Sequence, residues 1–252
     1  MNKVINLKSF RASCAGCRLS QLCLPSGFSQ HDFDQFEKIV RHERTLKKGE
    51  VLYKQGQPLK SLYIVHAGLA KVYLLDGDGD KQIVGFHMPG EMLGFDAIEN
   101  DIHSCTAEAQ EDSRICELPY DQLNELCHQV PALNKNFMAL MSHDMTNKHD
   151  MMLMLGKKTG DARVAILLLN MAARFHARGY SATEFNLNMS RQDMSNYLGL
   201  AVETISRFIT HMQDEKIIEV DRKYIHILDM SKLHMLAGGV SEAVYLQLER
   251  VE

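Results

Sequence analysis

Closely spaced glycines divide positions 49–94 of this 252-residue chain into short segments, and this spacing constrains the fold more than any other feature. Between the glycines, apolar and polar residues alternate, or β-branched and aromatic residues gather, as is typical of β-strands. The expected strands are 51–53, 61–65, 70–75, 82–86, 104–109 and 114–118. Strands about ten residues apart, joined by glycine turns, predict a small β-barrel or roll. The Asp/Gly run 76–80 is a hairpin-turn signal. It superficially suggests a calcium-binding loop, but it lacks the downstream Glu of an EF-hand, so a plain hairpin turn is expected.

The hydrophobic period becomes helical after Pro119. In the segment 131–155, apolar residues recur at steps of three and four or their multiples, which predicts a seam that packs against another helix. The methionines of this segment indicate an adaptable interface, and Gly156 is expected to end the helix. Further helices are expected at 161–177, 190–198 and 202–215, followed by a β-hairpin within 217–228. The fold class is therefore expected to be α+β.

Charge and composition limit the function classes. The formal net charge is −4, and acidic and basic residues are equally numerous within 162–230, so any DNA binding must come from a placed helix. No apolar run approaches the roughly 18–20 residues that span a membrane, and the first residues lack a signal-peptide core, so a cytoplasmic location is expected. We find no nucleophile–base set, no phosphate-binding glycine loop and no His-rich centre, and therefore expect no enzyme.

Three cysteines lie close together near the start of the chain, with the spacing C-x2-C-x5-C: Cys14, Cys17 and Cys23. In a reducing compartment a metal site is favoured over a disulfide. A zinc site needs a fourth Cys or His nearby, for which His31 is available, whereas an iron–sulfur cluster needs four thiolates, one of which can be distant. The spacing alone leaves both metals open. Cys105 and Cys127 are interpreted as core residues, and Cys116 is placed at the end of a strand.

The segment 190–209 has the pattern of a helix-turn-helix. Ser190 can cap a first helix, Gly199 can form the tight turn, and a second helix starts near Val202. The second helix of this motif enters the major groove with its N-terminus first. Its outward side chains there are Glu203, Thr204, Ser206 and Arg207. These side chains can contact base edges, and the hairpin that follows would form a wing.

Residues 197–207, Y-L-G-L-A-V-E-T-I-S-R, resemble the recognition region of the CRP/FNR superfamily of bacterial transcription regulators. The chain most resembles its FNR (fumarate and nitrate reduction regulator) branch, which includes the ANR-type oxygen sensors. The segments 20–25, 59–63, 81–87, 93–98, 116–119, 157–158 and 236–239 extend the resemblance over almost the whole chain. It implies a cupin-like β-roll similar to cyclic-nucleotide-binding domains, a long dimerisation helix and a C-terminal winged helix-turn-helix. The expected parts are an arm at 1–27, the roll at 28–130, the helix at 131–157, the DNA-binding domain at 158–231 and a tail at 232–252.

The resemblance also implies a function. It implies an oxygen-responsive regulator in which Cys14, Cys17, Cys23 and Cys116 hold a [4Fe-4S] cluster, whose reaction with O2 weakens a homodimer. The dimer would bind a TTGAT-N4-ATCAA-like palindrome and act together with RNA polymerase. The candidate DNA-binding residues are Glu203, Ser206, Arg207, Thr204 and Arg191. The candidate dimer-interface residues are Phe137, Met141, Met145, Lys148, Met152 and Leu155.

The chain differs from the cyclic-nucleotide-binding relatives at one place and departs from the FNR pattern at another. The segments 91–96 and 103–105 match the phosphate cradle of cyclic-nucleotide-binding relatives but lack its Arg, so we expect no cyclic nucleotide. Lys148 replaces a seam aspartate of the FNR branch. Facing its own copy across a two-fold axis it would oppose dimerisation by roughly 3 kcal/mol, unless it pairs with Asp144 instead. The alternative function is a cyclic-nucleotide- or zinc-binding regulatory module without oxygen sensing.

Overall fold

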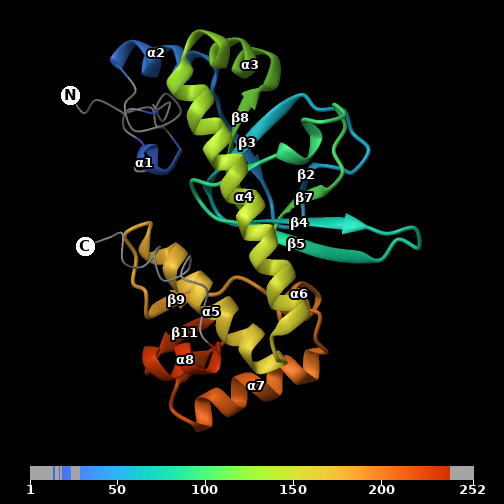
Figure 1. Cartoon of the computed structure of the whole chain (residues 1–252), viewed down its shortest axis with the longest axis vertical. Coiled ribbons are helices and arrows are strands. Elements are labelled where there is room, and N and C mark those ends of the chain that lie inside the picture. The colour runs from blue at the N-terminus through green and yellow to red at the C-terminus, as the bar shows by residue number, and fades with distance from the viewer. Residues whose placement is uncertain (1–13, 15–16, 18, 24–28, 239–252) are drawn as a thin grey trace, which may run out of the picture. The chain divides into compact units, whose positions relative to one another are not determined.

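The computed structural model describes residues 14, 17, 19–23 and 29–238. They belong to two compact units, one from the described parts of Met1–Leu75 and Phe86–Ser142, the other from Asp76–Gly85 and the described part of His143–Glu252. The labels in Figure 1, given where there is room, number the helices and the strands in chain order. Among the described residues, no helix has the length and apolar character required to cross a membrane.

The strands β1 to β8 form two four-stranded sheets, as the glycine spacing predicts. Their orders are β1-β8-β3-β6 and β2-β7-β4-β5. The strands are β1 (Arg41–Leu46), β2 (Val51–Tyr53), β3 (Ser61–Ala67), β4 (Ala70–Leu75), β5 (Lys81–His87), β6 (Met92–Leu93), β7 (Thr106–Ala109) and β8 (Ser113–Pro119). The prediction of a β-roll is confirmed, although β7 begins two residues later than expected. β1 was not predicted, because its charged sequence RHERTL carries no apolar alternation.

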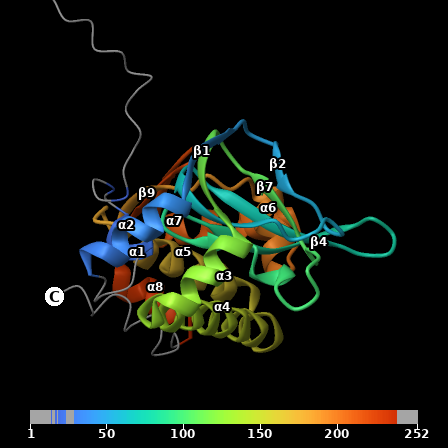
Figure 2. The same ribbon diagram turned by 90° about the horizontal axis from the view of Figure 1, so that it is seen from above.

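Helices cover one face of the β1-β8-β3-β6 sheet. They are α1 (Ser20–Cys23), α2 (Gln30–Ile39) and α3 (Tyr120–Gln129), and a 3-10 turn, η3 (Phe95–Ala97), follows β6. A capping box between Ser29 and Asp32 starts α2. α3 lies against α2 and against β3 and β8 (Figure 2). A buried core joins these elements to the start of the next helix: Phe36, Val40, Leu62, Ile64, Leu118, Leu123, Leu126, Val130 and Leu133. We call this set the helix-face core.

The long helix α4 (Pro131–Lys157) follows α3 directly. It continues through Gly156 to Lys157, one residue past the glycine that the periodic pattern set as its end. Of its predicted seam, Phe137, Met141 and Leu155 are half-buried in the single chain. Met145 and Met152 are 60% and 70% exposed, which leaves much of the apolar seam in water.

The second unit is organised around the buried helix α5 (Gly160–His176). Around it lie α6 (Arg191–Leu198), α7 (Val202–Asp214) and α8 (Met230–Leu236), with a sheet of order β10-β11-β9. The strands are β9 (Glu184–Asn186), β10 (Ile218–Asp221) and β11 (Tyr224–Ile227). β10 and β11 form the predicted hairpin, whereas β9, which pairs with β11, was not expected.

Candidate functional site

The helix-turn-helix forms as the sequence predicts. Ser190 and Asp193 make a capping box at the start of α6. Gly199 ends this helix with φ of 62°, a left-handed conformation that glycine adopts without strain. Met194 and Leu198 of α6, and Ile205 of α7, are fully buried. The two helices are therefore held together by an apolar contact, and the opposite face of α7 is left in solvent.

The exposed face of α7 carries three of the predicted DNA-binding residues. Glu203, Ser206 and Arg207 are all exposed, and their spacing of three and four residues places them on one side of the first two turns. The Ser206 hydroxyl donates to the Val202 carbonyl at 3.1 Å, which leaves its oxygen able to accept a hydrogen bond. The Arg207 guanidinium lies 5.7 Å from the centre of the Phe208 ring. This face can offer a carboxylate, a hydroxyl and a guanidinium to base edges.

The other two predicted DNA-binding residues are less accessible. Thr204 is half-buried within α7. Arg191, the first residue of α6, is half-buried, and its guanidinium lies 3.3 Å from the Met194 sulfur. Burial lowers the pKa of Arg191 from its ordinary value. Its remaining donors suit a phosphate contact better than a base contact.

Three of the four predicted cluster ligands pack against the helix-face core: Cys14, Cys23 and Cys116. Cys116 lies inside β8, paired with Ile64 of β3, and not at a strand end as expected. Cys14 donates its backbone N–H to a Glu37 carboxylate oxygen at 3.1 Å. Cys17 joins this group through its backbone N–H, which donates to the Cys14 carbonyl at 3.1 Å. Cys14 and Cys23 from the start of the unit thus pack against the same core as Cys116 from β8.

The pKa of Cys14 reflects its closeness to Cys116, Glu37 and Cys17. Burial, and then the negative charges that Cys116, Glu37 and Cys17 would carry, raise the pKa of Cys14 to about 12. Thiolates crowded in this way stay protonated unless a cation offsets their charge, and a bound metal does so. The donor set therefore fits an iron–sulfur cluster chemically. Among the described residues, however, no three His, Cys, Asp or Glu side chains are arranged to hold a metal ion.

The remaining candidate ligands are placed elsewhere. His31, the alternative zinc ligand, is exposed on α2 and lies 2.7 Å from the Gln35 side chain. Cys127 is half-buried against the helix-face core, and burial raises the pKa of its thiol. Cys105 is also half-buried, so both cysteines are less buried than the predicted core positions.

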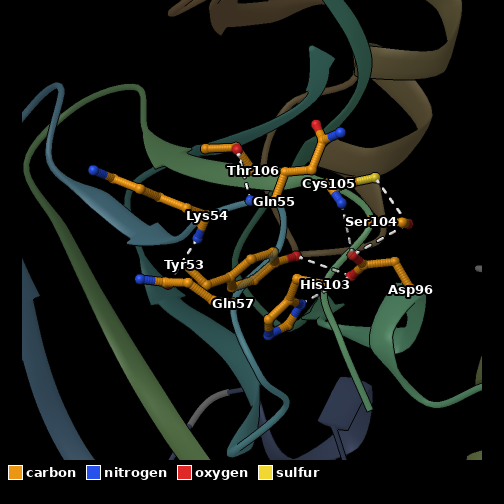
Figure 3. A network of polar contacts seen from close by, with 9 residues as sticks. All are labelled: Tyr53, Lys54, Gln55, Gln57, Asp96, His103, Ser104, Cys105 and Thr106. Atoms are coloured by element: carbon orange, nitrogen blue, oxygen red, sulfur yellow. Dashed lines mark hydrogen bonds and ion pairs between the residues drawn. The ribbon is translucent and has the colours of Figure 1, made fainter. Parts of the chain in front are cut away.

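A polar network in the roll was not predicted (Figure 3). Its centre is the Asp96 carboxylate, which accepts the Cys105 backbone N–H at 3.0 Å. The Tyr53 hydroxyl and the His103 Nδ1 lie 3.4 Å from it, and the Ser104 hydroxyl lies at 3.5 Å. His103 is 2% exposed and stacks on Tyr53 with a centroid separation of 3.8 Å. The segments 91–96 and 103–105 match the phosphate cradle of cyclic-nucleotide-binding relatives. In this protein the Asp96 carboxylate takes up the hydrogen-bond donors of these segments.

The pKa of Asp96 reflects these donors. Burial acts to raise its pKa, but the hydrogen bonds from His103, Cys105 and Ser104 outweigh burial, and the net pKa lies below the ordinary 3.8. Burial, and next the Asp96 charge, hold the pKa of Tyr53 well above its usual 10.0, so Tyr53 remains a hydrogen-bond donor. The sequence signal for this network was the position of Asp96 inside the matched segment 91–96.

Comparison with known proteins agrees with this architecture. Residues 43–130 match the cyclic nucleotide-binding domain family, and residues 162–236 match the Crp-like helix-turn-helix domain. The transcriptional activator protein Anr of Pseudomonas protegens is 43% identical, over 96% of this chain and 100% of its own length. The fumarate and nitrate reduction regulatory protein of Yersinia pestis is 43% identical, over 90% of both chains.

A solved structure supports the same assignment. FixK2 from Bradyrhizobium japonicum superposes with a TM-score of 0.72 at 30% identity, over 77% of this chain and 96% of its own. The relatives are transcription regulators and not enzymes. This chain accordingly belongs to the FNR/ANR branch of the CRP/FNR family of DNA-binding transcription regulators.

Proposed function

We propose that this protein is a cytoplasmic, oxygen-responsive transcription regulator that controls anaerobic gene expression. In this proposal it binds TTGAT-N4-ATCAA-like promoter palindromes as a homodimer and acts together with RNA polymerase. The observation that carries the DNA part is the exposure of Glu203, Ser206 and Arg207 on one face at the start of α7. Arg is suited to guanine, Glu to the cytosine amino group, and Ser to several base edges.

The proposed homodimer uses the apolar seam of α4. Phe137, Met141, Met145, Met152 and Leu155 would cover one another across a two-fold axis, since Met145 and Met152 are largely exposed in the single chain. A two-fold protein matches a two-fold DNA site. Lys148 interrupts the seam and lies 3.5 Å from the Asp144 carboxylate, the pairing that the sequence offered as the alternative to self-repulsion.

The proposed sensor is a [4Fe-4S] cluster held by Cys14, Cys17, Cys23 and Cys116. The chemistry that this group supplies when bound is reaction with O2. Support comes from the packing of Cys14, Cys23 and Cys116 against the helix-face core, which also touches the dimer helix. Phe137 of α4 packs there edge to face with Phe95, at a centroid separation of 5.4 Å. The ligand region and α4 therefore share one apolar contact.

The Asp96 network argues against the alternative function, in which the roll binds a cyclic nucleotide. A phosphate entering the cradle would meet the Asp96 carboxylate, which already accepts the Cys105 N–H. Two anions would then compete for one set of donors in a half-buried place. We therefore expect no saturable cAMP binding to the full chain in equilibrium dialysis.

Spectroscopy and metal analysis of anaerobically purified protein test the sensor. We expect a brown protein with about four Fe per chain and a broad absorption band that bleaches in air. Cys116→Ser should lose the iron, whereas the matched control Cys127→Ser, which removes a thiol beside the same core, should retain it. A colourless wild-type protein with one zinc per chain, or full iron content in Cys116→Ser, would contradict the assignment.

A further inference from the structure

Arg163, in the first turn of α5, connects three segments of the second unit. Its Nε–H donates to the Lys158 carbonyl at 3.0 Å, between α4 and α5. One terminal NH2 group donates to Leu155 in the last turn of α4 at 2.7 Å, and the other donates to Leu198 at the end of α6 at 2.9 Å. One guanidinium therefore bridges the end of α4 and the first helix of the helix-turn-helix.

These acceptors are the ones that a cation binds most favourably. The last four carbonyls of a helix lack partners within the helix, and the C-terminus carries a partial negative charge. Leu155 and Leu198 both lie in such a last turn. A lysine cannot reproduce the contact, because its single ammonium lacks the planar fork that reaches three separate acceptors.

Close packing around Arg163 reinforces the bridge. A Cβ added to Gly160 would lie 2.8 Å from the Phe208 ring of α7 and 3.1 Å from the Leu200 side chain. A Cβ on Gly199 would lie 3.7 Å from the Arg163 guanidinium and 3.8 Å from Leu155. The start of α5 and the end of α4 are thus in contact with the turn and with the recognition helix. We call residues 155–163 the junction.

We propose that Arg163 is a positioning residue that fixes the recognition helix relative to the end of α4, and so sets the half-site spacing that the dimer accepts. The inference rests on the proposed function. In a two-fold dimer α4 is fixed against its copy, so the junction determines where each recognition helix points. If the junction is loosened, the orientation of the recognition helix relative to α4 must be fixed when DNA binds, and this costs free energy. Binding to the correctly spaced palindrome is then weaker. The same freedom lets the two recognition helices reach half-sites with an incorrect spacing.

Fluorescence anisotropy with the anaerobically purified full chain tests this, using duplexes with N3, N4 and N5 spacers and a single half-site. One inserted base pair turns one half-site against the other by roughly 35°. We expect wild type to prefer N4 over N5 by at least about tenfold. Arg163→Met, which keeps an unbranched stem without donors, should reduce that ratio at least about fivefold. Its half-site affinity should stay within about threefold of wild type, and Arg163→Lys should lie between the two.

The matched control is Arg174→Met, which lies about 16 Å further along α5 and outside the junction. It should keep the wild-type ratio, and sedimentation should report the same dimer for all variants. An unchanged N4-to-N5 ratio in Arg163→Met would overturn the inference. So would an equal loss of half-site and palindrome binding, which would mark Arg163 as a residue needed only for folding. If wild type itself failed to bind the N4 duplex, the result would contradict the proposed function and not the role of Arg163.

Discussion

Removing the Asp96 carboxylate should destabilise the roll measurably, because four donors converge on it, of which Tyr53 and His103 are buried. Its one short hydrogen bond, from the Cys105 N–H at 3.0 Å, is of the charged kind that contributes about 1.5–3 kcal/mol. The three contacts at 3.4–3.5 Å are long and contribute less. We therefore expect Asp96→Ala to lower the free energy of unfolding by about 2–4 kcal/mol, and Asp96→Asn by about 1–2 kcal/mol, since its amide oxygen can still accept the Cys105 N–H.

The effect should depend on pH with a defined sign. The pKa of Asp96 is lower in the folded protein than its ordinary value, so its stabilisation is complete above about pH 4. The stabilisation disappears as pH falls through the folded-state pKa, where the carboxylate becomes protonated. The difference between wild type and Asp96→Asn should therefore be constant near neutrality and shrink in acid below about pH 4.

Urea unfolding followed by far-UV circular dichroism measures the stability. Hydrogen exchange of the peptide containing residues 103–106 gives a local measure. The matched control is Asp78→Ala in the exposed hairpin turn, expected to change stability by no more than about 0.5 kcal/mol. The Cys105 amide should exchange faster in Asp96→Ala but not in the control. If the two variants unfolded at the same urea concentration with unchanged exchange, the network would have no energetic role.

Three further predictions concern the other parts of the protein. Lys148→Leu should raise the dimer fraction of cluster-free protein in sedimentation, because it removes a charge from the apolar seam; a monomer fraction equal to wild type would argue against this. Ser190→Ala should destabilise the second unit by about 1 kcal/mol in thermal unfolding, through loss of the cap of α6; an unchanged midpoint would contradict it. Arg207→Ala should weaken binding at one base pair of each half-site by about 1–3 kcal/mol, measured by competition with single-base variants. Uniform weakening across all sequences would assign Arg207 to phosphate instead.

The regular elements were predictable where a local pattern specifies them. The strands β2 to β5 follow glycine turns and alternation, and the helix-turn-helix follows its cap, its apolar positions and its turn glycine. β1 was missed because its pairing with β8 does not depend on apolar alternation. α4 runs one residue past Gly156 because glycine lowers helix propensity by only about 1 kcal/mol, which the surrounding helix can offset.

The candidate sites depended much more on tertiary contacts. Spacing identified Cys14, Cys17 and Cys23 as possible ligands but could not choose a metal or a fourth ligand. Cys116 comes near Cys14 because both pack against the helix-face core. The Asp96 network was missed for a similar reason, since the acceptor and its donors come from separate segments that meet only when the roll closes.

The sequence by itself determined the caps, turns and exposed face of the recognition helix, because these depend on residues within one or two turns of each other. Ser190 and Asp193 are three residues apart, so they form the capping box in any helix that starts there. Only the tertiary structure decided which distant groups share an environment: the thiols at one core, the carboxylate among its donors, and Arg163 between two helix ends. Such contacts depend on which faces pack together, and the periodicity of a single segment carries no information about its partner.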